Sequence, residues 1–457
     1  MTSNQMRTEH DSLGTVQVPA EAYWGAQTER SRRHFPQGTA LMPLRQIYAL
    51  AQIKKAAAIV NERVGKLDAE RRKWIVSACE EILEGKWDDQ FPLVVWQTGS
   101  GTQTNMNVNE VIAHRGNEMA GKELLHPNDH VNCSQSSNDV FPSAILLSSV
   151  QALDEELLPA MLQMEQQLHA LSEKYAGLVK TGRTHLQDAT PITLGQEISA
   201  WEAMIRHGRE RLLEAREHLL YLPIGGTAVG TGLNAPEDFD EEMCKQLEVQ
   251  TGLKCRPVDN KFFGLSSQSM MAAFHGQLKA LAADLYKMAS DIRFLSCGPR
   301  CGIGELTIPA NEPGSSIMPG KVNPTQVESL TMICLQVFGH DVSVSMAASQ
   351  GQAQLNVYLP LILNDTLESV TLLSKGMEGF TAHLLEGLKA NEANIALNLH
   401  RSLMLVTALT PEIGYENAAK IALHAHRNGL TLREAALELK LISAERFDAL
   451  VDPGKMI

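Results

Sequence analysis

Apolar residues recur at steps of three and four along several long segments of the chain. The pattern is clear over 150–175, 194–222 and 271–295, and weaker over 370–388. Because such steps keep one side of a helix apolar, each segment is expected to form a long helix with one seam facing partner helices. We interpret these Leu- and Met-rich seams as the packed core of a helical bundle.

This bundle predicts a mainly α fold in three parts. Residues 1–135 mix turns, short helices and at most a hairpin, residues 136–392 hold the long helices, and residues 393–457 form a small helical appendage. A helix of about thirty residues is roughly 45 Å long. A single layer of such helices leaves apolar faces uncovered within one subunit, so we expect subunits to associate into a larger bundle.

Charge and cysteine content narrow the functional class. The formal net charge of −13 disfavours nucleic acid and anionic membranes as partners. No apolar run reaches about eighteen residues, so no membrane span is expected. The polar N-terminal segment is unlike a secretory signal or a transit peptide, which predicts a cytoplasmic protein.

The seven cysteines include no CxxC pair, which indicates that the chain has no disulfide framework. Cys297 and Cys301 are expected to be buried thiols rather than metal ligands.

The most unusual polar segment is GSSIMPGKVNP, residues 314–324. Gly314 and Gly320 permit backbone conformations closed to other residues, and the final proline disfavours a helical conformation for Asn323. The segment is therefore expected to be a loop, followed by a helix that begins near Thr325. Its hydroxyls, ammonium and amide suit a carboxylate or phosphate substrate. An ordinary surface loop is the alternative.

The loop resembles the GSSxMPxKxN signature of the fumarase/aspartase superfamily of lyases. The resemblance implies that Ser315 is the base that removes a proton next to a carboxylate. It also implies that the loop binds substrate through Ser316, Lys321, Val322 and Asn323. Lys321 is further expected to stabilise the serine alkoxide and the doubly charged aci-carboxylate intermediate.

Two earlier polar segments match the same superfamily. In QTGSGTQTNMNVNE, residues 97–110, the match assigns Ser100, Gly101 and Thr102 to a substrate-binding turn, although an asparagine-rich surface face of a helix is the alternative. In NCSQSSNDVFP, residues 132–142, simple N-capping of the first long helix is possible. Since a capped helix end also attracts anions, both interpretations hold. The match assigns a substrate carboxylate to Ser136, Ser137 and Asn138.

A histidine stands between the first two long helices, in TGRTHLQDATP, residues 181–191. A lone histidine is usually structural, but His185 in a tight polar loop is a better acid–base candidate. Glu328, in the first helical turn after the 314–324 loop, is placed to orient and activate it. In fumarases the matching His and Glu form such a pair, and Thr184 is expected to contact the substrate.

The predicted helices separate these groups widely. Ser136 and Asn138 begin the first long helix and His185 follows its far end, about 45–50 Å away at 1.5 Å per residue. A substrate of a few carbons cannot touch both. Either they serve different sites, or subunits pack antiparallel and share sites. The superfamily does the latter, as a homotetramer with a twenty-helix core.

Two further segments are ambiguous. HPNDH, residues 126–130, is open to three interpretations: a second carboxylate pocket, as in fumarases, a metal site, or a solvated loop. The second-pocket interpretation uses His126, Pro127, Asn128 and Asp129. The glycine run GGTAVGTG, residues 225–232, lacks the Lys-Ser/Thr of a nucleotide loop and is interpreted as a tight turn between helices.

Similarity to the class II, iron-free fumarases covers nearly the whole chain. His185 and Gly320 stand where aspartases carry Gln and Ala, and 135–138 reads Gln-Ser-Ser-Asn where aspartases have Gln-Ser-Thr-Asn. The resemblance therefore implies reversible trans hydration of fumarate to L-malate, a step of the tricarboxylic acid cycle, with no metal or organic cofactor. Aspartate ammonia-lyase is the alternative, and a non-enzymatic crystallin-like relative is a remote one.

Overall fold

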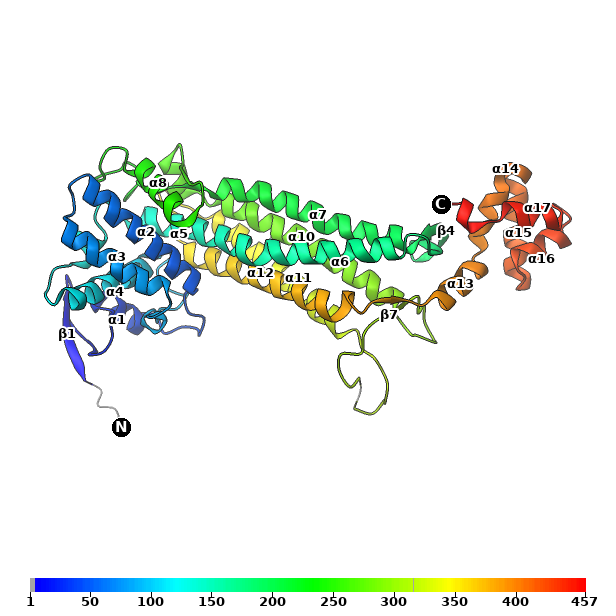
Figure 1. Ribbon diagram of the computed structural model, residues 1–457, viewed down its shortest axis with the longest axis horizontal. Helices are drawn as coiled ribbons and strands as arrows, with labels where there is room; N and C mark the ends of the chain where they lie inside the picture. The colour runs from blue at the N-terminus through cyan, green and yellow to red at the C-terminus, as the bar shows by residue number, and fades with distance from the viewer. Residues whose placement is uncertain (1–4, 315) are drawn as a thin grey trace. The chain divides into compact units, whose positions relative to one another are not determined.

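The computed structural model describes residues 5–314 and 316–457, and the fold is mainly α, as predicted (Figure 1). The chain divides into two compact units. Unit 1 comprises the described residues up to Pro159 together with Arg209–Ala282 and Leu335–Ser374. Unit 2 comprises Ala160–Gly208, Ala283–Cys334 and Lys375–Ile457. The three-part division expected from the sequence stays a prediction.

The long helices follow the apolar periodicity. Their bounds are α5 (Ser137–Ala152), continued by η3 (Leu153–Leu157) and α6 (Leu158–Lys174), α7 (Leu194–Leu219), α10 (Ser269–Leu295), α11 (Thr325–Ala348) and α12 (Leu359–Phe380), continued by η4 (Thr381–Leu385). Pro159 is the second residue of α6 and directly follows the π-helical turn η3, so it lies inside a continuous helical run where the regular hydrogen-bond pattern has already changed. The seam residues, among them Leu168, Ile205 and Leu285, are fully buried.

Helix α12 begins well before the position that the apolar pattern indicates. Its first half carries the buried polar residues Asp365, Thr366 and Ser369, which interrupt the apolar stripe. Ser369 Oγ lies 3.0 Å from Nε2 of His275 and 2.9 Å from Nδ1 of His340. Because these polar residues are buried in a hydrogen-bonded layer between helices, the apolar pattern did not predict the N-terminal half of α12.

The N-terminal part of unit 1 combines a hairpin with short helices. The strands β1 (Met6–Asp11) and β2 (Gly14–Pro19) are antiparallel. The helices are α1 (Ala26–His34), α2 (Leu44–Arg63), α3 (Ala69–Leu83), η1 (Asp88–Gln90), α4 (Thr102–Ala120) and η2 (Pro127–Val131). In this unit α2 packs against α3, α5 and α8 (Phe239–Thr251), and α4 packs against α3 and α5 (Figure 1). Helices α2 and α4 thus both pack against α5.

Three further two-stranded sheets occur in the described residues. The hairpin of β3 (Val179–Thr184) and β4 (Gln187–Thr193) is antiparallel, and so is the pair β7 (Leu306–Thr307) and β8 (Lys389–Ala390). The pair β5 (Tyr221–Leu222) and β6 (Arg256–Pro257) is parallel. A short helix, α9 (Lys261–Ser266), follows β6.

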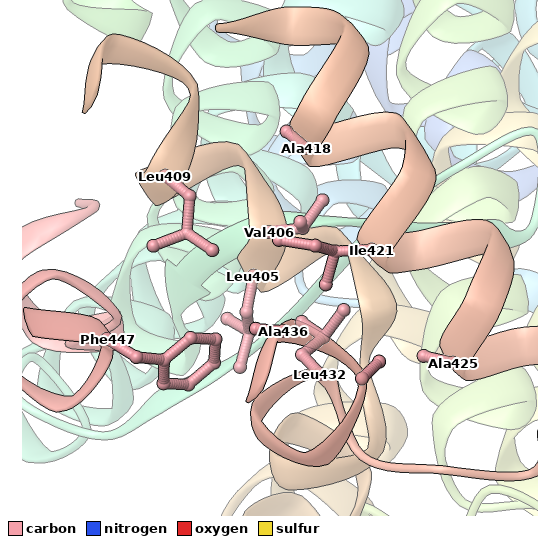
Figure 2. Close-up of a cluster of buried hydrophobic side chains, with 10 residues drawn as sticks. Leu405, Val406, Leu409, Ala418, Ile421, Ala425, Leu432, Ala436 and Phe447 are labelled. Carbon is pink, nitrogen blue, oxygen red and sulfur yellow. The ribbon is translucent and has the colours of Figure 1, made fainter. Parts of the chain in front are cut away.

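The C-terminal residues form a small helical region with its own apolar cluster (Figure 2). Its elements are α13 (Glu392–Arg401), η5 (Leu403–Leu409), α14 (Thr410–Ile413), α15 (Tyr415–Asn428), α16 (Leu432–Glu438), α17 (Ala444–Leu450) and η6 (Pro453–Lys455). Phe447, Leu409 and Ile421 are among the side chains that meet in this cluster. These C-terminal residues are thus helical, while their separation as an appendage of residues 393–457 stays a prediction.

One expectation about the cysteines was wrong. Cys297 and Cys301 are exposed, because they lie in the turns that follow α10 rather than on its buried seam. All seven cysteines are free.

Helix α11 is the one helix of the described residues that is long and apolar enough to span a membrane by length and composition. Core helices of globular proteins also meet this test.

Candidate active site

The turn that precedes α4 requires its two glycines. A Cβ at Gly99 would lie 1.4 Å from the carbonyl oxygen of Val357, and Gly101 has φ +72 with the ring of Phe141 where its Cβ would stand. The turn therefore lies tightly against its neighbours. It leaves Ser100 and Thr102 half-buried at the helix start, with their hydroxyls 2.9 Å apart.

The start of α5 is a capped helix end. The Ser136 side chain accepts a hydrogen bond from the N–H of Asn138 at 3.2 Å, and Asp139 accepts one from the N–H of Ser136 at 2.9 Å. This reciprocal arrangement is a capping box. The N-capping interpretation is confirmed. Because the N-terminus of a helix attracts anions, the cap is compatible with a carboxylate site at Ser136, Ser137 and Asn138.

Asn105, Asn107 and Asn109 of α4 are buried, so the surface-face alternative for residues 97–110 was wrong. The Asn105 amide donates to Ser137 Oγ at 3.1 Å, and the Asn109 amide donates to Asn132 Oδ1 at 3.2 Å. Their side chains join α4 to the segment that leads into α5. The turn at Ser100–Thr102 and the cap at Ser136–Asn138 are thereby brought together in unit 1.

Sequence reasoning missed Lys54 of α2. Its side chain is fully buried, and its ammonium donates to Asn132 Oδ1 at 2.9 Å and to Gln135 Oε1 at 3.0 Å. Burial lowers the pKa of Lys54 to about 7. The available signal was a lysine on the apolar side of α2, at helical spacing from Leu50 and Asn61, both of which are also buried.

His185 occupies the two-residue turn of the β3–β4 hairpin. Both turn residues have left-handed backbones, with φ 54 at His185 and φ 60 at Leu186. Such turns ordinarily use Asn or Gly, so the sequence showed a tight loop but not the strands. The histidine is exposed at the tip, and its left-handed backbone is a strained conformation of the kind that clusters at functional sites.

A buried ionic network supports this hairpin. Glu305, just before β7, is fully buried and accepts two hydrogen bonds from Arg183 of β3. The ammonium of Lys180, also buried, lies 3.2 Å from the same carboxylate and 2.9 Å from Glu197. Burial alone would raise the pKa of Glu305, but the Arg183 hydrogen bonds and the two positive charges hold it below its ordinary value.

The described residues of the 314–324 segment, Gly314 and 316–324, form a loop, as predicted. A Cβ at Gly314 would lie 1.3 Å from the carbonyl oxygen of Lys321, so the loop closes on itself at a glycine. The Asn323 amide donates to the Gly314 carbonyl at 3.1 Å. The loop exposes the side chains of Ser316, Lys321 and Val322. The predicted base, Ser315, lies outside the described residues.

Glu328 is in the first turn of α11, as predicted, and its side chain is exposed. Within one chain, no hydrogen bond or ion pair of the described residues joins Glu328 to His185. Their pairing therefore stays a prediction. Thr184, His185 and the 314–328 groups belong to unit 2, whereas the groups around Ser100 and Ser136 belong to unit 1.

The 126–130 segment forms the short π-helix η2. The His126 ring accepts from the N–H of Asp129 at 3.2 Å, and the His130 ring accepts from the N–H of His126 at 2.8 Å. Asn128 is exposed, and Pro127 begins the turn. Over residues 5–314 and 316–457, no group of three or more His, Cys, Asp or Glu is placed to hold a metal ion. The metal alternative for this segment thus has no structural support.

Comparison with known proteins agrees with this arrangement. A family model described as a lyase matches residues 14–339, and one described as the fumarase C C-terminus matches residues 405–457. The chain therefore belongs to this lyase family. Within the family, it resembles the class II fumarate hydratases over its full length.

Two relatives and two solved structures give the extent of that similarity. The class II fumarate hydratase of Bacillus subtilis is 52% identical over 457 residues, covering 99% of both chains. That of Thermosynechococcus vestitus is 54% identical over 447 residues, covering 97% of this chain and 96% of the relative. The class II fumarase of Schistosoma mansoni superposes with a TM-score of 0.97 at 42% identity, covering 99% of both chains. A fumarate lyase:delta crystallin from Brucella melitensis, bound to cobalt, has a TM-score of 0.95 at 39% identity and the same coverage.

Proposed function

We propose that this protein catalyses the reversible trans hydration of fumarate to L-malate. The observation that carries the proposal is the loop that begins at Gly314, in which Gly314 lies against the Lys321 carbonyl and accepts a hydrogen bond from the Asn323 amide. The sequence of this loop matches the fumarase signature at its motif positions. The resemblance to class II fumarate hydratases over the whole chain supports it. The reaction places the protein in the tricarboxylic acid cycle.

One carboxylate of the substrate binds at the N-terminus of α5. The hydroxyls of Ser136 and Ser137 and the amide of Asn138 are neutral donors, and the free N–H groups of the helix end add a partial positive charge. Ser100 and Thr102 contact the same carboxylate, because the hydrogen bond from Asn105 to Ser137 Oγ joins the start of α4 to the start of α5. The overall charge of −13 makes such local attraction necessary.

The second set of groups carries out the chemistry. Starting from malate, Ser315 removes the proton next to the carboxylate that becomes the aci-carboxylate, and its pair of electrons moves into that group. Lys321 stabilises the resulting double negative charge, with Ser316 and Asn323 as hydrogen-bonding neighbours. His185, activated by Glu328 and flanked by Thr184, protonates the departing hydroxide on the opposite face, so that water and fumarate leave.

The active unit in this proposal is a homotetramer with sites shared between subunits. Helix α11 supports it, because an apolar face of this helix is uncovered in the single chain: Met332, Leu335, Val342 and Met346 are 65%, 57%, 63% and 61% exposed. An apolar face of that length on one helix is the kind of surface that a second copy of a bundle covers. Because α11 also carries Glu328 in its first turn, assembly at this face would bring neighbouring subunits to the site.

Two finer assignments complete the proposal. The segment His126–Asp129 is a second carboxylate pocket near the entrance, which is consistent with the exposure of His126, Asn128 and Asp129. The protein works in the cytoplasm, which is consistent with seven free cysteines.

The decisive experiment follows fumarate by its ultraviolet absorbance, starting from malate and separately from aspartate. Formation of fumarate from malate alone is the expected result. Turnover of aspartate without turnover of malate would overturn the proposal in favour of an ammonia-lyase. Ser315→Ala is the control, because loss of the base should abolish the signal without preventing binding of a dicarboxylate.

A further inference from the structure

We propose that Asp139 is a positioning residue for the substrate carboxylate: it clamps the Ser136–Asn138 cap to the glycine-rich turn 225–232. This inference rests on the proposed function, because that function places a carboxylate at Ser136, Ser137 and Asn138. It assigns a role in binding geometry to a residue that does not itself face the substrate.

The Asp139 carboxylate joins two separate segments of unit 1. One of its oxygens accepts from the N–H of Ser136 at 2.9 Å. The other accepts from the N–H of Gly225 at 2.9 Å and from the N–H of Thr227 at 3.0 Å. The side chain is fully buried, so these three hydrogen bonds are made to a charged acceptor away from water. The carboxylate therefore fixes the distance between the cap and the turn.

A second contact ties the same turn to a predicted substrate ligand. The Asn138 side-chain amide donates one N–H to the carbonyl oxygen of Ala228 at 2.8 Å. An amide nitrogen carries two N–H groups, so the remaining one is left for a substrate oxygen. The turn thereby sets the direction in which Asn138 presents its donor.

The turn itself is held in an uncommon conformation. Gly225 has φ +85, and Thr227 has φ +52, a left-handed backbone that a β-branched residue rarely adopts. A Cβ at Gly225 would lie 2.8 Å from the Cβ of Asp240, so the turn also packs closely against α8. Strained backbones of this kind persist where the surroundings over-determine them, and the two N–H groups held by Asp139 supply that constraint.

Lys54 holds the residues that lead into the cap. Its ammonium donates to the side chains of Asn132 and Gln135. Burial raises the pKa of Asp139 to about 6, and the nearby charge of Lys54 opposes that rise by favouring the carboxylate. The segment 132–139 is thus fixed at both ends by buried charged groups. Such an arrangement pre-organises the three substrate ligands, which lowers the cost of ordering them when substrate binds.

The chain contains a matched control in Glu110 of α4. Its carboxylate is also buried and also accepts three backbone hydrogen bonds, from Gly25, Gln27 and Thr28 at 2.8, 2.8 and 3.2 Å. These bonds cap α1 and involve no predicted substrate ligand. Glu110 therefore shares the chemistry of Asp139 and differs from it in what the hydrogen bonds hold.

The test compares Asp139→Asn with Glu110→Gln in the full-length protein. Each substitution replaces one acceptor oxygen by a donor amide. For Asp139→Asn we expect the KM for malate and the dissociation constant of succinate, a non-reacting dicarboxylate, to rise about tenfold or more, because one segment is released. We expect a smaller change in kcat. For Glu110→Gln we expect a lowered unfolding temperature with KM and the succinate constant within about twofold of the parent.

Several outcomes would overturn the inference. If both variants lose thermal stability and neither changes KM or succinate binding, Asp139 is only a structural cap. If Asp139→Asn does not fold, Asp139→Ser is used; it offers one acceptor instead of two, and unchanged succinate binding in it counts against the clamp. Failure of the parent protein to convert malate would instead contradict the proposed function, independently of either variant.

Discussion

The guanidinium of Arg183 makes two hydrogen bonds to the carboxylate of Glu305, at 3.0 and 2.7 Å, between the hairpin that carries His185 and the segment that leads to the 314–324 loop. Glu305 also accepts from the Asn398 amide of α13 at 3.1 Å. One buried carboxylate therefore connects three separate segments of unit 2. The position of the histidine depends on an ionic contact that does not touch it.

Replacement of Arg183 should reveal this dependence. Arg183→Met leaves the buried carboxylate with fewer partners and should lower the free energy of unfolding by about 2–4 kcal/mol. The measurement is the shift of the thermal unfolding midpoint at fixed protein concentration. The control is Arg446→Met, which breaks a similar two-bond pair with Glu412 on the exposed surface and should leave the midpoint nearly unchanged. Equal shifts in the two variants would contradict a special role for the buried pair.

The same pair predicts a pH dependence of stability. Because the pKa of Glu305 is lower in the folded chain than its ordinary value of 4.5, its ionised form stabilises the fold at pH above 4.5. This contribution is lost as the pH falls through the lowered folded pKa. The unfolding midpoint of Glu305→Gln should therefore differ strongly from that of the parent at pH 7 and less at each step below pH 4.5. A difference that stays constant with pH would show that the ionised form is not what stabilises the fold.

His185→Asn should reduce kcat by about 10²–10⁴, because a general acid–base group contributes that much and asparagine cannot transfer the proton. Asparagine tolerates the left-handed backbone of this position, so the fold should be retained. Leu186→Asn is the matched control, since Leu186 shares the turn and the positive φ. Steady-state kinetics with malate measure both. Near-normal turnover in His185→Asn would return this residue to a structural role.

Two inactive variants should restore each other if sites are shared. Asn138→Ala removes a group of unit 1 and His185→Asn a group of unit 2, and the tetramer proposal draws these groups from different chains. When the two variants are mixed, denatured and reassembled, some sites should carry neither lesion, and partial activity should return. Mixed tetramers that form without regaining activity would show that both residues serve the site of one chain.

The exposed face of α11 should govern assembly. Val342→Asp places a charge on this face and should shift the protein to smaller species with loss of activity, as measured by light scattering after size-exclusion chromatography. Val249→Asp on α8 is the control, because Val249 is 80% exposed but is not part of the α11 face. If the Val342 variant keeps the size of the parent, the α11 face is not an interface.

Helical periodicity predicted the long helices well because their seams are continuous and apolar. It misplaced the start of α12, where Asp365 and Ser369 are buried in a polar layer that mimics an exposed face. It also missed the β3–β4 strands, because His185 and Leu186 form the turn without Asn or Gly. Local pattern carries no information about a polar partner supplied by a distant helix.

In the candidate site, too, the features encoded by local sequence were predicted and those that depend on distant partners were not. The motif of residues 314–324 and its glycines predicted the loop, since the contact of Gly314 with Lys321 is encoded locally. Lys54 was not predicted, because its partners Asn132 and Gln135 are far along the chain. The role of Asp139 in holding the 225–232 turn was hidden for the same reason. Residues that position a site without facing the substrate can be recognised only once the three-dimensional structure is known.

The apolar cluster of the C-terminal region closes on itself within residues 405–447 (Figure 2), yet this region also packs on the hairpin: η5 contacts β4, and α13 contacts β3. We expect such a cluster to open as one cooperative unit, with a free energy below that of global unfolding. Each opening would remove the contacts of η5 and α13 with the two strands that carry the turn. The order of the His185 side chain would then depend on helices outside the proposed site, and we expect a proteolytic cut or a fused tag in those helices to change turnover through the hairpin.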